Sequence, residues 1–129
     1  MKRAIGRTVV VEFRYFDKST CSRCRTTDTN VEKTVKVLRK ALGESKVKFK
    51  TTKIPASRMS ESNAVLVNGK DVEELVNGHN ARRSTPCRGC GVLTNSPCNC
   101  RAYSYRKRRY RYVPRAMILQ AVKKALSGK

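Results

Sequence analysis

The 129-residue chain has no apolar run approaching the roughly 18 residues that a membrane-spanning helix requires. Its first apolar stretch, residues 8–16, is interrupted by Glu12 and Arg14, and no small-residue cleavage site follows it. We therefore expect no signal peptide, no membrane partner and a cytoplasmic location. Thiols stay mostly reduced in that compartment, so the six cysteines indicate redox chemistry or metal binding before structural disulfides.

Acidic residues are absent from the whole second part of the chain. All nine Asp and Glu lie in residues 1–74 together with seventeen Lys and Arg, whereas residues 75–129 hold thirteen Lys and Arg and no acid. The resulting net charge of +21 should attract polyanions such as RNA or DNA, nonspecifically at low salt. A solvated basic surface with no specific ligand explains the same charge, and the charge alone does not separate the two interpretations.

Linkers, internal repeats and low-complexity segments are also missing. With 39% apolar residues and clear periodic segments, residues 1–129 are expected to form a single domain with a core of its own. His79 is the only histidine, and it falls in the loop-like stretch 76–85. We interpret it as a surface loop residue. The alternative is that it is the fourth ligand of a metal ion.

Residues 8–42 carry the main chemical signal, a Cys-x-x-Cys between a predicted strand and a predicted helix. Residues 9–16 are rich in β-branched and aromatic side chains, which favours a strand. The helix is indicated by Val31, Val35, Leu38 and Leu42, which fall on one helical face. Cys21 and Cys24 therefore lie where a strand turns into a helix, as at the start of a thioredoxin-type βαβ unit.

Unpaired N–H groups and the helix dipole favour a thiolate at such a position, and Arg23 and Arg25 add positive charge. We expect Cys21, which is nearer the helix start, to be the nucleophile and Cys24 the resolving thiol of a thiol-disulfide oxidoreductase. The same spacing also fits half of a zinc site, or two cysteines that are simply packed at a helix start.

The remaining elements are predicted from alternation and turn residues. Residues 47–54 alternate as a second strand, which the preceding helix would place parallel to the first. Residues 64–72 form a hairpin signal around Asn68-Gly69, which suits a type I′ turn. Residues 71–76 predict a short edge strand or the start of a helix. Residues 113–126 predict a closing helix with Pro114 in its first turn.

A second cysteine cluster has the pattern Cys-x-x-Cys, seven residues, Cys-x-Cys. Its four members, Cys87, Cys90, Cys98 and Cys100, lie within fourteen residues. Four thiolates at this spacing can close a tetrahedral zinc site, with Gly89 and Gly91 allowing sharp turns. There are two alternatives. This cluster exchanges thiols with Cys21 and Cys24, or its thiols are chemically inert.

Residues 101–112, RAYSYRKRRYRY, interleave tyrosines with a run of cations and predict a β-ribbon that turns at Lys107-Arg108. Interleaved Tyr and Arg are typical of a single-stranded nucleic-acid platform. The candidate contacts are Arg101, Tyr103, Tyr105, Arg106, Lys107, Arg108, Arg109 and Arg111. The alternative is a hairpin whose tyrosines cover the core while its arginines are solvated.

The chain resembles, over nearly its full length, an uncharacterised family of small thioredoxin-like prokaryotic proteins described as a domain of unknown function. The matching residues are Thr20-Cys21-Ser-Arg-Cys24 with Thr27, Ser62-Asn63 before Val65-Leu-Val-Asn-Gly69, Cys87-x-x-Cys90-Gly91, Cys100-Arg101 with Tyr105, and Pro114-Arg-Ala-Met-Ile118. The resemblance implies a thioredoxin-like fold with a cysteine-bearing insertion and brings no reaction with it. Ser62-Asn63 stands where thioredoxins place a cis-proline, and the basic run 106–111 is a second departure.

Together these observations predict an α/β fold with a thioredoxin-like βαβ–ββ–α sheet and a cysteine-rich insertion, residues 87–112, before the last helix. The expected function is thiol-based redox chemistry or metal handling, acting on a thiol, a disulfide or a metal ion, with zinc as the expected metal. The alternative is a zinc-stabilised nucleic-acid-binding module.

Overall fold

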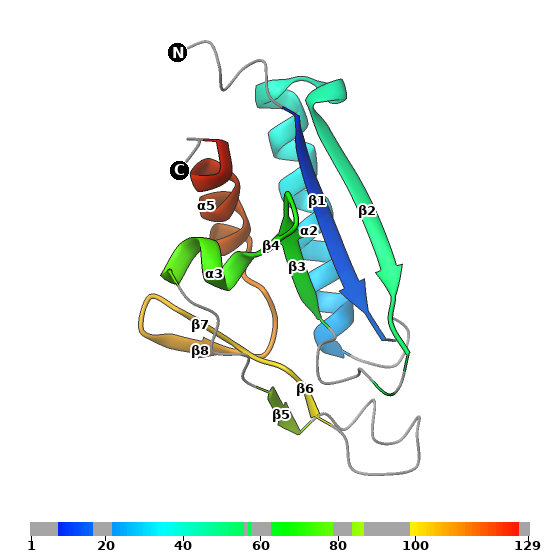
Figure 1. Cartoon of the computed structure of the whole chain (residues 1–129), viewed down its shortest axis with the longest axis vertical. Coiled ribbons are helices and arrows are strands. Elements are labelled where there is room, and N and C mark those ends of the chain that lie inside the picture. Colours follow the sequence, from blue (N-terminus) through cyan, green and yellow to red (C-terminus); the bar gives the residue numbers. More distant parts are fainter. Residues whose placement is uncertain are drawn as a thin grey trace.

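The protein has a mixed α/β architecture in which one mixed sheet is packed against helices (Figure 1). The computed structural model describes residues 8–16, 22–55, 57, 63–78, 84–86 and 99–126. Only the backbone is described for residues 22, 23, 84–86 and 99–101. The described part contains three α-helices, and none of its helices is long and apolar enough to cross a membrane.

The central sheet has the strand order β2-β1-β3-β4. Strands β1 (Val9–Tyr15) and β2 (Val47–Lys53) are parallel, and helix α2 (Ser22–Leu42) connects them. Strand β3 (Ala64–Val67) runs antiparallel to β1, and the two-residue β4 (Lys70–Asp71) extends the sheet beyond β3. The predicted parallel pairing around the first helix and the predicted hairpin are therefore confirmed.

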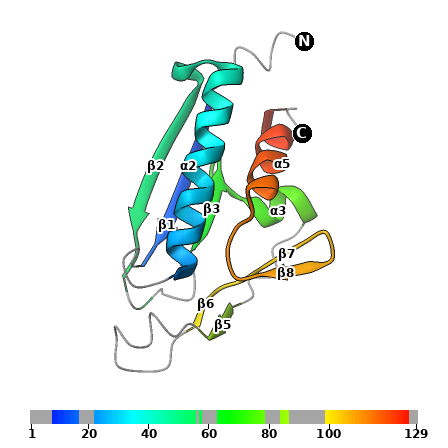
Figure 2. The same cartoon turned by 180° about the vertical axis from the view of Figure 1, so that it is seen from behind.

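The core lies between the sheet and α2, which is behind the strands in Figure 1 and in front of them in Figure 2. Alternate residues of β1 and β3 face the helices because successive strand side chains point to opposite faces. The core-cluster residues of these elements are Val9, Val11, Phe13, Cys24, Val31, Val35, Leu38, Val65 and Val67. Helix α2 ends at Leu42, where Gly43 takes φ +112° and donates its N–H to the Arg39 carbonyl at 2.9 Å.

The other face of β1 and β2 carries polar side chains. Glu12 Oε2 accepts hydrogen bonds from Arg14 Nε at 3.1 Å and from Thr52 Oγ1 at 2.8 Å. Partial burial acts to raise the pKa of Glu12. The hydrogen bonds from Arg14 and Thr52, with the charges of Arg14 and Lys50, outweigh that effect and leave this pKa lowered.

The hairpin and the helix after it follow local sequence signals. Asn68 (φ 51°) and Gly69 (φ 85°) occupy the two positive-φ positions of a type I′ turn. Helix α3 (Val72–Asn77) begins where the Asp71 carboxylate accepts the Glu73 N–H at 2.9 Å, and Gly78 ends it in a left-handed conformation. Of the two alternatives for residues 71–76, the helix start is confirmed, since only Asp71 belongs to a strand.

The second part of the chain forms two small ribbons and the closing helix. Strands β5 (Ser84–Pro86) and β6 (Asn99–Arg101) pair with each other, as do β7 (Tyr103–Tyr105) and β8 (Arg108–Tyr110). The β7–β8 turn is Arg106-Lys107, so the predicted turn at Lys107-Arg108 is wrong by one residue.

Helix α5 (Arg115–Leu126) packs against α2, α3 and the sheet. Pro114 precedes its first residue, and the Pro114 carbonyl accepts the Met117 N–H at 3.1 Å. The buried face consists of Met117, Ile118, Ala121 and Val122.

Candidate functional site

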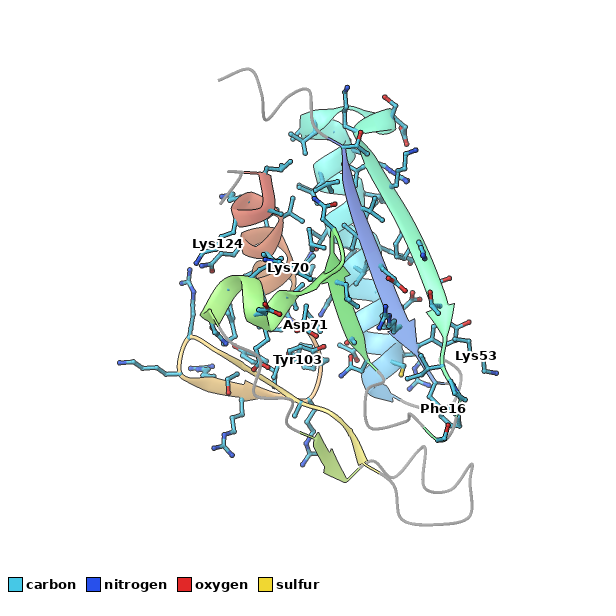
Figure 3. All side chains as sticks on the ribbon, in the orientation of Figure 1. Phe16, Lys53, Lys70, Asp71, Tyr103 and Lys124 are labelled. Carbon is cyan, nitrogen blue, oxygen red and sulfur yellow. The ribbon has the colours of Figure 1, made fainter. Side chains whose placement is uncertain are left out.

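The candidate thiol site lies at the edge of the sheet where both parallel strands end. Strands β1 and β2 point to the edge at which α2 begins (Figure 1). The pairing continues one step beyond the strands, because the Ile54 N–H donates to the Tyr15 carbonyl at 2.8 Å. Figure 3 shows Phe16 and Lys53 together at this edge. Helix N-termini favour negative charge, and this edge is therefore suited to a thiolate.

Cys24 is the third residue of α2 and is fully buried, with 0% of its surface exposed. It shares the core-facing side of the helix with Thr27 and Val31, three and seven residues further on. Cys24 is therefore part of the core beneath the helix start. Cys21, its partner in the Cys-x-x-Cys, lies outside the described residues, immediately before the first residue of α2.

A buried hydrogen-bond network lies one helical turn beyond Cys24. The Thr27 hydroxyl donates to Asn63 Oδ1 and accepts the Val113 N–H at 3.1 Å. Thr27 and Asn63 are both 0% exposed, so each polar atom here needs a partner within the protein. The residue before β3 is thereby held against the cysteine-bearing end of α2. We call Thr27, Asn63 and their partners the Thr27–Asn63 network.

The same network reaches the second half of the chain. Asn63 Nδ2 donates to the Arg111 carbonyl at 2.9 Å, and the Tyr103 hydroxyl donates to the Asn63 carbonyl at 2.9 Å. Asn30 Nδ2 donates to the Val113 carbonyl at 2.8 Å. Helix α2, the entry to β3, the β7–β8 ribbon and the entry to α5 therefore meet at one buried point.

The backbone of the second cysteine cluster is described only at its ends. Strands β5 and β6 pair Pro86 with Asn99 and Thr85 with Cys100, so the two ends of the intervening segment lie side by side. Cys87, Cys90, Cys98 and His79 lie outside the described residues, and only the backbone of Cys100 is described. Among the described side chains, no group of three or more His, Cys, Asp or Glu is placed to hold a metal ion.

The predicted nucleic-acid contacts divide into buried tyrosines and exposed cations. Tyr103 is 0% and Tyr105 5% exposed, and both belong to the hydrophobic core. The exposed cations of the ribbon are Arg106, Lys107, Arg108, Arg109 and Arg111. The side chain of Arg101 is outside the described set.

The Thr27–Asn63 network is the feature that sequence reasoning did not identify. The sequence singles out Thr27 and Asn63 only through the family resemblance, in which Ser62-Asn63 stands in place of the thioredoxin cis-proline. Asn63 adopts φ 67°, a left-handed conformation that asparagine tolerates better than most residues. The only sequence signal for this network is an asparagine directly before an apolar strand. The sequence does not indicate that Thr27, 36 residues away, is its partner.

These features define an α/β protein with a cysteine in the first turn of a helix, at the carboxyl edge of two parallel strands. A family model described as Domain of unknown function (DUF2703) matches residues 9–122, and the chain belongs to that family. No curated protein and no solved structure matches the chain.

Proposed function

We propose that this chain is a thiol-based redox or metal-handling protein whose working thiols are Cys21 and Cys24. One observation carries the proposal: Cys24 lies buried in the first turn of α2, at the edge where the parallel strands end. A buried second thiol suits a resolving cysteine, because it is protected from solvent oxidants and is only three residues from the first in the sequence.

We also propose that this α/β domain is thioredoxin-like. This assignment is supported by the parallel β1–α2–β2 unit, the antiparallel hairpin beside β1 and the closing helix α5. These are the βαβ–ββ–α elements that the resemblance implies. Asn63 stands before β3, where thioredoxins place proline, and its side chain fixes this segment to α2 by hydrogen bonding to Thr27.

The proposed reaction is a two-step thiol-disulfide exchange. The Cys21 thiolate attacks one sulfur of a substrate disulfide, the S–S bond breaks, and the other substrate sulfur leaves as a thiolate. The Cys24 thiolate then attacks the Cys21 sulfur of the mixed disulfide, releasing the second substrate thiolate. The substrate gains two electrons, and Cys21 and Cys24 lose them in forming a disulfide. A low-molecular-weight thiol is the class of reductant that would restore the pair.

Zinc is proposed for Cys87, Cys90, Cys98 and Cys100 as a structural ion. The β5–β6 pairing supports this assignment, since it holds both ends of the cysteine-bearing segment together. Four thiolates are a usual donor set for tetrahedral zinc, which would stabilise the fold of this segment. Under this proposal Cys21 and Cys24 remain the two reactive thiols.

The test uses the full chain, purified anaerobically without chelator, with its zinc content and free thiols measured. One zinc and two titratable thiols per chain are expected. Reaction with 5,5′-dithiobis(2-nitrobenzoate) is then followed for the wild type, Cys21→Ser and Cys24→Ser. We expect Cys21→Ser to lose the fast phase and Cys24→Ser to accumulate a mixed disulfide at Cys21, located by peptide mass mapping. An unchanged fast phase in Cys21→Ser would contradict the proposal.

A further inference from the structure

The β7–β8 ribbon is a compact finger whose closed end projects from the body of the protein. Strands β7 and β8 are joined by a two-residue turn in which Arg106 (φ 52°) and Lys107 (φ 67°) both take positive φ, as a type I′ turn requires. Figures 1 and 2 both show the closed end below α3 and away from β1 and β2. The turn therefore presents two cations at an accessible tip.

The inner strand of the ribbon is fixed to the core. The Tyr105 hydroxyl donates to Gln120 Oε1 at 3.1 Å, and Tyr103 belongs to the Thr27–Asn63 network. Ser104 donates its N–H to Glu73 Oε2 at 3.0 Å, and its carbonyl accepts from Asn77 Nδ2 at 2.9 Å. Every residue of β7 is therefore hydrogen-bonded to another part of the protein, and β8 is held in place by its pairing with β7.

The exposed cations lie at the tip of this finger, along β8 and just beyond it. Arg106 and Lys107 form the tip, while Arg108 and Arg109 are consecutive on β8 and so leave opposite faces of the ribbon. All four are exposed, as is Arg111 just beyond the strand. The Arg106 guanidinium lies 5.4 Å from the centre of the Tyr105 ring. Residues 75–129 contain no acid, and the Glu73 carboxylate that contacts the ribbon accepts the backbone N–H of Ser104.

The tyrosines do not form a platform for stacked bases. Tyr103 and Tyr105 are buried, and the partly buried Tyr110 packs on both Tyr105 and Tyr112, with ring centres 6.5 Å and 5.6 Å away. Single-strand binding relies on exposed aromatic faces as well as on charge. The two buried tyrosines agree with the alternative interpretation of the sequence, in which the tyrosines of the hairpin cover the core. Phosphate contact is therefore left as the main source of affinity.

We infer that the β7–β8 ribbon binds duplex DNA by entering the major groove, with Arg106, Lys107, Arg108, Arg109 and Arg111 contacting phosphates. The major groove of B-form DNA, about 12 Å wide, admits a two-stranded β-ribbon. The exposed cations of the tip and of β8 reach the phosphates that line this groove. The major groove of A-form RNA is deep and narrow and does not admit the ribbon. Contacts of this kind position a protein on DNA without reading its sequence.

The test is fluorescence anisotropy of the full-length wild type with a labelled 20-bp DNA duplex, the same sequence as duplex RNA, and one DNA strand alone. We expect tightest binding to duplex DNA and a slope of log K against log salt of about −4.5, from five phosphate contacts. Equal or tighter binding of duplex RNA or of the single strand would overturn the inference.

Two triple variants with the same net charge distinguish binding by the ribbon from nonspecific attraction of DNA to the protein's overall positive charge. Lys107→Gln/Arg108→Gln/Arg109→Gln removes three ribbon cations, and Lys48→Gln/Lys50→Gln/Lys53→Gln removes three exposed cations of β2. The ribbon variant should lose about tenfold or more in affinity and flatten the slope by about 3, while the β2 variant should change affinity less than about threefold. Equal losses in the two variants overturn the inference. If the ribbon triple does not fold, the single variants Arg108→Gln and Arg109→Gln should each flatten the slope by about 1.

Discussion

The hydroxyl of Thr27 donates a hydrogen bond to the side-chain oxygen of Asn63 inside the core, between residues 36 positions apart. Thr27 also accepts the Val113 N–H, so one side chain satisfies two buried partners from separate segments. This arrangement fixes the segment before β3 against α2, one turn beyond the candidate resolving cysteine.

Replacing Thr27 with Val should therefore destabilise the protein well beyond the loss of one hydrogen bond. The substitution leaves both the Val113 N–H and Asn63 Oδ1 buried without this partner, which should lower the free energy of unfolding by about 2–4 kcal/mol. Urea denaturation measures the change. The matched control is Thr29→Val, on the exposed side of the same helix, which should shift stability by no more than about 0.5 kcal/mol. Equal effects of the two variants would show that the network contributes nothing.

The burial of Cys24 predicts an order of reaction for the two thiols of the Cys-x-x-Cys. In the reduced native protein, iodoacetamide should modify Cys21 at least about tenfold faster than Cys24, because alkylation of a fully buried thiol requires local opening of the helix start. Peptide mass mapping over time measures both rates. In urea the two rates should converge. Faster native modification of Cys24 would reverse the roles of nucleophile and resolving thiol.

Glu73 should anchor the β7–β8 ribbon. Its side chain is buried, with only 1% of its surface exposed. Its carboxylate accepts the Ser104 N–H at 3.0 Å, so Glu73→Ala leaves that backbone donor unsatisfied. We expect a loss of about 2–3 kcal/mol in unfolding free energy and faster amide exchange at Ser104. Glu74→Ala, at the exposed neighbouring position, is the control and should change neither quantity appreciably. Unaltered exchange at Ser104 in Glu73→Ala would refute the anchoring role.

Glu12 should contribute stability that depends on pH. Its pKa is lowered in the folded protein, so the contribution is complete above the unfolded value of about 4.3 and is lost as the pH falls through the folded value. Glu12→Gln should therefore be less stable than the wild type by about 1 kcal/mol at pH 7, and this difference should shrink as the pH falls below the unfolded pKa of Glu12. Urea midpoints across this range test the sign. Glu32→Gln, on the exposed side of α2, should differ by less than about 0.5 kcal/mol at pH 7.

Local sequence determined much of the fold. The spacing of Val31, Val35 and Leu38 defined the buried face of α2, since a 3.6-residue period leaves little choice of orientation. Asn68-Gly69 specified its turn because these residues tolerate positive φ. The strand pattern before the Cys-x-x-Cys and the helical period after it likewise place the motif at a strand-to-helix junction without any tertiary information.

Tertiary structure alone decided the ribbon register and the buried network. Arg106 and Lys107 are not residues typical of a type I′ turn. The position of the turn is set by the burial of Tyr103 and Tyr105 and by the hydrogen bond from the Tyr105 hydroxyl to Gln120. The partners of Asn63 come from α2, β7 and the segment before α5, and no short-range pattern connects them. Local propensity acts over a few residues, whereas burial and hydrogen-bond satisfaction are settled only once distant segments have packed together.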